Sequence, residues 1–235
     1  PRTKLSDSLT YDITAWTLPH AYGLDGFAVE TQLKATLYMP SPAPKSDFMA
    51  TEGFIAYAVR WESLRTAQFL NAVQQAGLKV YFHEKGFKLA GQTYAPGTLL
   101  LLTGENKRPD FHALINDYAA RYAVDIKGLV TGMVDGGTDF GSSSVKMVPN
   151  PRVGILAGDS FSSLNVGEIW HFFEQQLGKP AHLIFEDDLN NALADLDVVF
   201  VPEGGYDIAG NEALTAWVGK GGTLIAIGGA IDVLA

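Results

Sequence analysis

The sequence predicts an α/β protein whose C-terminal part, from residue 152, forms a parallel sheet. Apolar runs of strand length alternate with segments of helical periodicity along this part of the chain. The runs are apolar almost without interruption, which is typical of parallel strands covered by helices on both faces. A content of 47% hydrophobic and 18% charged residues in 235 residues is that of a packed globular chain.

The first 52 residues are expected to form an irregular arm or linker. Pro40, Pro42 and Pro44 disfavour a helix there, because each proline fixes its own backbone and restricts the residue before it. No run in the chain approaches the roughly 20 apolar residues that span a bilayer, and the first residues lack the apolar core of a signal peptide.

Residues 53–133 are predicted to form a smaller α/β domain. It begins with a strand at 53–60, and a helix follows at 63–76. The apolar face of that helix is expected to consist of Leu64, Ala67, Leu70 and Val73. Strand, strand, helix and strand are then expected at 78–84, 98–104, 110–124 and 125–133. The stretch 134–151 is dense in Gly, Ser and Pro and is expected to be a linker.

The predicted parallel-sheet domain covers residues 152–235. Its strands are expected at 152–158, 181–187, 197–205 and 223–229. The helix expected at 164–178 places Val166, Ile169, Phe173 and Leu177 on one face, and further helices are expected at 189–195 and 211–222. Ala230 should begin another helix. Because doubly wound domains normally continue beyond this point, the sequence is interpreted as a fragment of something longer.

Three glycine-rich loops follow strands of this predicted sheet. In a parallel open sheet, ligands bind beyond the carboxyl ends of the strands, so the three loops could line one crevice. Turns from strand to helix need glycine in any case, which is the simpler explanation of the same residues. The loops hold no phosphate-binding fingerprint. The candidate crevice residues are Gly158, Asp159, Ser160, Glu203, Gly204, Gly205, Tyr206, Gly228, Gly229 and Ala230.

The last strand, in GGTLIAIGGAI, has the form of a nucleophile elbow. Together with GILAG and DVVFVPEGGYD, it resembles class I glutamine amidotransferase-like domains. The resemblance implies a flavodoxin-like sheet, incomplete here, whose elbow residue is cysteine. This chain has Ala230 at that position and no cysteine at all. The resemblance therefore supports the fold and argues against amidotransfer.

Two longer stretches resemble large bacterial zinc carboxypeptidase-like proteins of the carboxypeptidase A superfamily. They are YDITAWTLPHAYGLDGF at 11–27 and VGILAGDSFSSLNVGEIWHFFEQQL at 153–177. The resemblance implies a C-terminal accessory region that packs on an upstream catalytic domain and assists with its peptide substrate. Zinc would belong to that domain, so no cofactor is expected in this chain. A periplasmic or extracellular location is implied by the same resemblance.

Other chemistries have weaker support in the sequence. His171 and Glu174 form the only His-x-x-Glu, but zinc needs a third protein ligand, and nothing in the sequence brings His182 onto the same face. The stretch GDSFSSL resembles GDS[L] serine esterases and would make Ser160, Ser162 or Ser163 the nucleophile, yet the D-x-x-H pair of that family is absent.

The charge of the chain limits its partners. With 17 basic and 26 acidic residues, the net charge of −9 repels phosphate backbones and anionic lipid, so neither nucleic acid nor membrane is expected as a partner. The alternative to an accessory role is a module that binds a small ligand or a peptide in the glycine-rich crevice.

Overall fold

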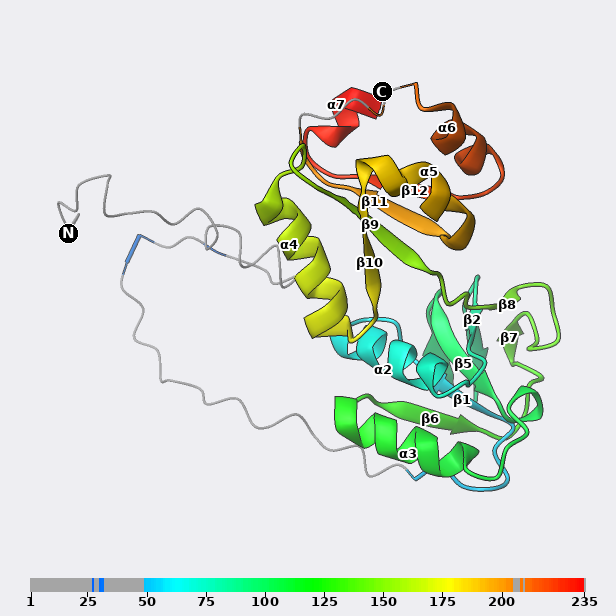
Figure 1. The fold of residues 1–235 in the computed structure, drawn as a ribbon. Coiled ribbons are helices and arrows are strands. Elements are labelled where there is room, and N and C mark those ends of the chain that lie inside the picture. Colours follow the sequence, from blue (N-terminus) through cyan, green and yellow to red (C-terminus); the bar gives the residue numbers. More distant parts are fainter. Residues whose placement is uncertain (1–26, 28–29, 32–48, 205–207, 209, 235) are drawn as a thin grey trace. The chain divides into compact units, whose positions relative to one another are not determined.

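The computed structural model describes residues 27, 30–31, 49–204, 208 and 210–234. The chain divides into two compact units, residues 1–42 and 43–235. The predicted arm at 1–52 lies almost wholly outside the described residues, and all the elements below belong to the second unit (Figure 1).

An antiparallel sheet of five strands organises the first half of this unit, in the order β6-β1-β5-β2-β8. Its strands are β1 Ala56–Val59, β2 Tyr81–His83, β5 Thr98–Leu102, β6 Ile126–Leu129 and β8 Val145–Met147. A smaller sheet, in the order β4-β3-β7, consists of β3 Phe87–Leu89, β4 Gln92–Tyr94 and β7 Gly136–Gly137. The helical segments are α2 Leu64–Gln75, η2 Thr103–Glu105 and α3 Phe111–Tyr122.

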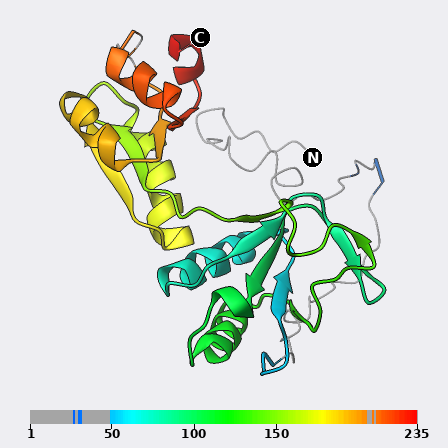
Figure 2. The same ribbon diagram turned by 90° about the vertical axis from the view of Figure 1, so that its right-hand side faces the viewer.

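Side chains of β1 alternate between two hydrophobic clusters, as successive residues of a strand must. Tyr57 and Val59 pack with residues of α2 and α3. Ala56 and Ala58 pack with Phe87 and other residues of the smaller sheet. Figure 2 shows the two helices on one side of the larger sheet and the smaller sheet on the other. The first half is therefore a mixed α/β structure with three layers.

Two expectations for the first half are corrected. The stretch 134–151 is not simply a linker, because it contains β7, which pairs with β3, and β8, which pairs with β2. The buried face of α2 also matches the predicted one only in part: Val73 is buried as predicted, but Leu64 is 43% exposed, and Thr66, Phe69 and Asn71 are buried. The polar residues Thr66 and Asn71 lie inside because they find hydrogen-bond acceptors there.

The second half contains the predicted parallel sheet, with four strands in the order β10-β9-β11-β12. The strands are β9 Val153–Ala157, β10 Ala181–Phe185, β11 Val198–Val201 and β12 Thr223–Ala226. All three neighbouring pairs are parallel, with Ile155 of β9 opposite Leu183 of β10 and Phe200 of β11. The prediction of α/β structure with a parallel sheet is confirmed.

Helices cover both faces of this sheet (Figure 1). The helical segments are α4 Ser163–His171, the π-helix η3 Phe172–Leu177, η4 Glu186–Asp188, α5 Leu189–Ala192, η5 Leu193–Asp195, α6 Glu212–Gly219 and α7 Ala230–Leu234. The predicted face of α4 and η3 is confirmed, since Val166, Ile169, Phe173 and Leu177 pack with Ile155. Residues of α5, α6 and α7 pack with Leu156 and Val199, which face the other way.

Helix α2 binds the end of η3 through three side-chain amides. Gln68 Nε2, Asn71 Nδ2 and Gln75 Nε2 donate to the main-chain oxygens of Gln176, Leu177 and Gly178, at 2.6, 2.8 and 2.8 Å. The last carbonyls of a helix have no partner within it. The amides of α2 supply these partners and join the two halves of the unit.

Candidate functional site

The first crevice loop follows β9. Main-chain N–H of Phe161 donates to Gly158 O at 3.2 Å, which closes the turn. Ser160 Oγ donates to Glu186 Oε2 at 3.1 Å, and Glu186 follows β10. Phe161 is buried, whereas Gly158 and Asp159 are exposed. The loop therefore anchors itself through an aromatic side chain and leaves its backbone open to solvent.

The second loop follows β11 and is bound directly to the first. Ser162 N donates to Glu203 O at 2.7 Å, and Gly204 forms a β-bridge with Phe161. In the opposite direction, Glu203 N donates to Asn165 Oδ1 at 3.0 Å, and Asn165 lies in the first turn of α4. Two of the predicted residues of this loop, Gly205 and Tyr206, lie outside the described residues.

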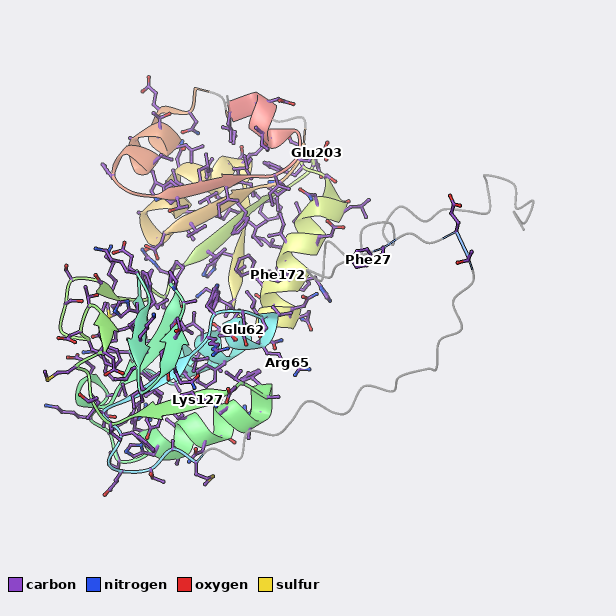
Figure 3. The ribbon with its side chains drawn as sticks, turned by 180° about the vertical axis from the view of Figure 1, so that it is seen from behind. Phe27, Glu62, Arg65, Lys127, Phe172 and Glu203 are labelled. Atoms are coloured by element: carbon purple, nitrogen blue, oxygen red, sulfur yellow. The ribbon has the colours of Figure 1, made fainter. Side chains whose placement is uncertain are left out.

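The third loop follows β12 and meets the second at Glu203. A Cβ atom added to Gly228 would lie 3.2 Å from Glu203 Oε2, and one added to Gly229 would lie 3.6 Å from Glu203 Oε1. Figure 3 shows Glu203 beside the start of α7. The structure thus brings together the described parts of all three predicted loops, and the carboxylate of Glu203 lies against the turn at Gly228 and Gly229.

Ala230, at the position predicted to be an elbow, has no reactive side chain. Ala230 begins α7, its side chain is fully buried, and its N–H donates to Ile227 O at 3.3 Å. A methyl group cannot attack a carbonyl, and the polar group that lies against this turn is the carboxylate of Glu203. This arrangement can accept hydrogen bonds or bind a cationic group, but it offers no nucleophile at the elbow.

The serines of GDSFSSL have structural partners. Ser160 donates to Glu186, while Ser162 caps α4 by accepting a hydrogen bond from Asn165 N at 3.4 Å. Ser163 is the exposed first residue of α4. A serine nucleophile needs an adjacent general base that a third group orients. The hydrogen bonds of Ser160 and Ser162 fit turn and cap roles instead.

His171 and Glu174 have different surroundings in the structure. His171 ends α4 and is exposed, whereas Glu174 lies in the π-helix and its Oε1 accepts a hydrogen bond from Ala181 N at 3.0 Å. His182 is exposed on β10. Among the residues that the structure describes, no group of three His, Asp or Glu side chains could hold a metal ion. Glu174 instead connects η3 to the first residue of β10.

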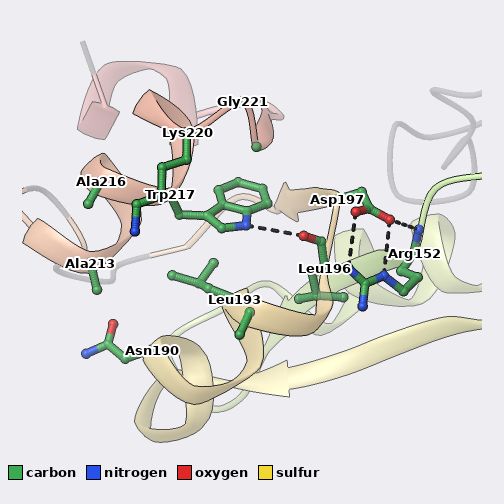
Figure 4. A pocket seen from close by; sticks show the side chains of 12 residues that line it. Arg152, Asn190, Leu193, Leu196, Asp197, Ala213, Ala216, Trp217, Lys220 and Gly221 are labelled. Carbon is green, nitrogen blue, oxygen red and sulfur yellow. Dashed lines mark hydrogen bonds and ion pairs between the residues drawn. The ribbon is translucent and has the colours of Figure 1, made fainter. Parts of the chain in front are cut away.

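Sequence reasoning missed Asn165 and a hollow at the amino ends of the strands. The hollow, of about 580 Å³, has Trp217 as its aromatic wall (Figure 4). Arg152 holds the carboxylate of Asp197 with contacts of 3.2 Å from Nε and Nη2, and these hydrogen bonds lower the pKa of Asp197. Trp217 Nε1 donates to Leu196 O at 3.2 Å. The one signal in the sequence that could have pointed to Asn165 is the presence of a polar side chain in the first turn of the helix that follows β9.

Comparison with protein-family models, with curated proteins and with solved structures finds no match for this chain. No helix within the described residues has the length and apolar character required to cross a bilayer.

Proposed function

We propose that the chain is a non-catalytic accessory region of a zinc metallocarboxypeptidase-like protein, which packs on or assists the catalytic domain that hydrolyses peptides. The observation that carries the proposal is the elbow: Ala230 stands buried at the position of the nucleophile, and the carboxylate of Glu203 lies against the adjoining glycines. In this proposal, residues 152–235 correspond to an amidotransferase-like domain that lacks its reactive group.

The strand order supports the proposed relation to flavodoxin-like and amidotransferase-like domains. Counted along the chain, the order β10-β9-β11-β12 is second, first, third and fourth. This is the beginning of the 2-1-3-4-5 order of flavodoxin-like sheets, whose ligands bind at the carboxyl ends of the strands. The glycine loops that converge here lie at those ends.

Electrostatics also argues against acyl-transfer chemistry at the elbow. A tetrahedral intermediate carries an oxyanion, which enzymes stabilise with hydrogen-bond donors or positive charge. Glu203 Oε2 lies 3.2 Å from the place that a Cβ of Gly228 would occupy. Its negative charge would oppose an oxyanion beside this turn. The three converging loops are therefore better suited to contacting a neighbour or a ligand than to cleaving an amide.

The partner, the zinc and the location in this proposal rest on the resemblance to zinc carboxypeptidase-like proteins. The partner is the catalytic domain that would precede Pro1, and that domain would hold the zinc. A periplasmic or extracellular location belongs to the same proposal. Nearly all of the resembling segment at 11–27 lies outside the described residues, so only its sequence supports the proposal.

Co-purification tests the accessory role. The chain is expressed together with a separately tagged catalytic domain, and affinity capture of that domain is followed by measurement of its melting temperature. The proposal expects stoichiometric capture of the chain and a higher melting temperature in the complex. Capture no better than that of an unrelated acidic protein, with an unchanged melting temperature, would contradict it.

A second candidate function is binding of a small ligand or a peptide in the crevice. The bonds from Ser162 to Glu203 and from Glu203 to Asn165 favour it, because they fix the positions of the loops before any ligand arrives. A thermal-shift screen with metabolites and short peptides tests it. A ligand whose effect disappears in Glu203→Gln would support this function, and the absence of any shift would count against it.

A further inference from the structure

Strand β10 ends the parallel sheet with one open edge. It pairs with β9 over Ala181–Phe185, and no other strand pairs with it among the residues that the structure describes. The N–H and C=O groups of such an edge can pair with another chain. Natural edges are usually protected by charged side chains, prolines or bulges. The five residues of β10 contain no proline and no Lys, Arg, Asp or Glu.

Exposed apolar side chains line one face of this edge. Leu183 is 46% exposed and Phe185 is 56% exposed, whereas Ile184 between them is buried. Since successive side chains of a strand point to opposite faces, Leu183 and Phe185 share the face that Ile155 occupies on β9. A neighbouring strand would cover both side chains.

An acidic hollow lies beside the same edge, on the side where the helical segments after β10 pack. It has a volume of about 310 Å³, and His182, Leu183 and Ile184 contribute to it from β10. Asp188 and Asp195 provide its two carboxylates. Asp188 forms no ion pair with any described residue, and the one ion pair of Asp195 with a described residue is with the guanidinium of Arg152, at 3.5 Å. Both aspartates are exposed, so the hollow offers negative charge beside an open strand edge.

We propose that the edge of β10 binds an extended segment of a partner protein in which apolar residues alternate with lysine or arginine. The segment would add a fifth strand to the sheet through main-chain hydrogen bonds. Its apolar side chains would cover Leu183 and Phe185, and a basic side chain would enter the hollow toward Asp188 and Asp195. Main-chain pairing supplies affinity, and the side-chain contacts supply specificity.

The occupant is a basic partner rather than a second copy of the chain. Pairing of two β10 edges would bring two acidic hollows together, and each chain has a net charge of −9. Like charges at such short separation oppose association. The proposal does not rest on the accessory role, because the edge is complete within residues 181–196.

The test uses the full chain labelled with 15N and an end-blocked hexapeptide of alternating lysine and valine. Two probes are matched to it: a glutamate–valine hexapeptide, and the lysine–valine hexapeptide with alternate peptide nitrogens methylated. Backbone amide shifts locate binding, and hydrogen exchange of the β10 amides reports strand pairing. With the lysine–valine hexapeptide we expect amide shifts and slower hydrogen exchange at residues 181–185. The glutamate–valine peptide and the N-methylated peptide should bind at least about tenfold more weakly.

Charge variants distinguish binding at the hollow from general electrostatic attraction between the acidic chain and a basic peptide. Asp188→Asn removes a carboxylate of the hollow and is expected to weaken binding of the lysine–valine peptide about threefold. Asp187→Asn removes the same charge from a neighbouring exposed residue outside the hollow, and binding should hardly change. The proposal would be overturned if the glutamate–valine peptide bound equally well, or if no binding occurred at millimolar peptide. It would also be overturned if the amide shifts were confined to other strands, or if the two substitutions had equal effects. So would a dimer of the chain alone in sedimentation whose β10 amides are protected.

Discussion

Asn71 Nδ2 in α2 donates a hydrogen bond to the main-chain oxygen of Leu177, 2.8 Å away at the end of η3. The residues are 106 positions apart in the sequence, and Asn71 is 8% exposed. A buried amide is tolerated because it satisfies a helix-terminal carbonyl that has no partner within its own helix. This contact makes α2 the element that joins the antiparallel sheet of the first half to the parallel sheet of the second.

Replacement of Asn71 should destabilise the folded chain. Asn71→Ala leaves Leu177 O without its donor in a part-buried site, and we expect a loss of about 1–3 kcal/mol in the free energy of unfolding. Urea denaturation followed by circular dichroism measures it. Gln75→Ala is the matched control: Gln75 donates to Gly178 O at 2.8 Å but is exposed, so water can replace it. Equal losses in the two variants would contradict the assigned role of Asn71.

Two glycines with similar backbone angles should respond differently to alanine. Gly86 has φ +71°, and an added Cβ would lie 2.6 Å from Tyr94 O; Gly91 has φ +75°, and nothing lies within 4 Å of its added Cβ. Gly91→Ala should cost about 1 kcal/mol from backbone strain alone. Gly86→Ala should cost about 1–3 kcal/mol more, because main-chain atoms must move. Thermal unfolding of both variants gives the comparison, and similar melting temperatures would mean that the turn at Gly86 is looser than described.

The contact between Arg152 and Asp197 predicts a pH-dependent contribution to stability. Hydrogen bonds from Arg152 lower the pKa of Asp197 in the folded chain. A carboxyl whose folded pKa is depressed stabilises the fold above its unfolded pKa, near 4, and loses that contribution as the pH falls through its folded pKa. Asp197→Asn should therefore be slightly less stable than the parent at pH 7, and the difference should vanish in acid.

The size of this effect should be small and sensitive to salt. Both side chains are about half exposed, at 52% and 46%, so solvent screens their attraction. Urea unfolding at pH 7 and at pH 3, with low and high salt, measures the dependence. A difference between parent and Asp197→Asn that grew as the pH fell would have the wrong sign and would contradict the assignment.

Installing a nucleophile at the elbow should not create an amidase. Ala230→Cys places a thiol at the start of α7, but the polar group beside it is the carboxylate of Glu203, which would raise rather than lower the thiol pKa. We expect no glutamine hydrolysis above background in Ala230→Cys or in the double variant with Glu203→Gln. A coupled assay for released glutamate measures it. Turnover in either variant would show that a catalytic base is still present.

The second half was the more predictable part of the fold from sequence. Strands such as Val153–Ala157 are buried on both faces and leave an uninterrupted apolar run, and parallel topology by itself places the loops after them at one edge. That is why the convergence of Gly158, Glu203 and Gly228 could be anticipated. The contact between Asn165 and Glu203 could not be anticipated, because it depends on how the first turn of α4 packs beside the loop that follows β11.

The first half shows what local patterns omit. Gly136–Gly137 has no intrinsic strand preference and forms β7 only because β3 offers partners. In α2, apolar periodicity favoured Leu64 over Asn71, yet the hydrogen bond to Leu177 draws the amide inside. Likewise, the π-helix at Phe172–Leu177 leaves no mark in the apolar spacing of its sequence. These features come from tertiary contacts, which a single sequence does not display.

In the proposed function, the chain assists a peptidase and has no catalytic role of its own. The most direct test is the kcat/KM of the zinc carboxypeptidase-like catalytic domain for a peptide substrate, measured alone and with the chain added as a separate polypeptide. We expect no hydrolysis by the chain alone and a changed, saturable kcat/KM when the two are combined. Hydrolysis by the chain alone, or an unchanged kcat/KM at saturating chain, would contradict the account.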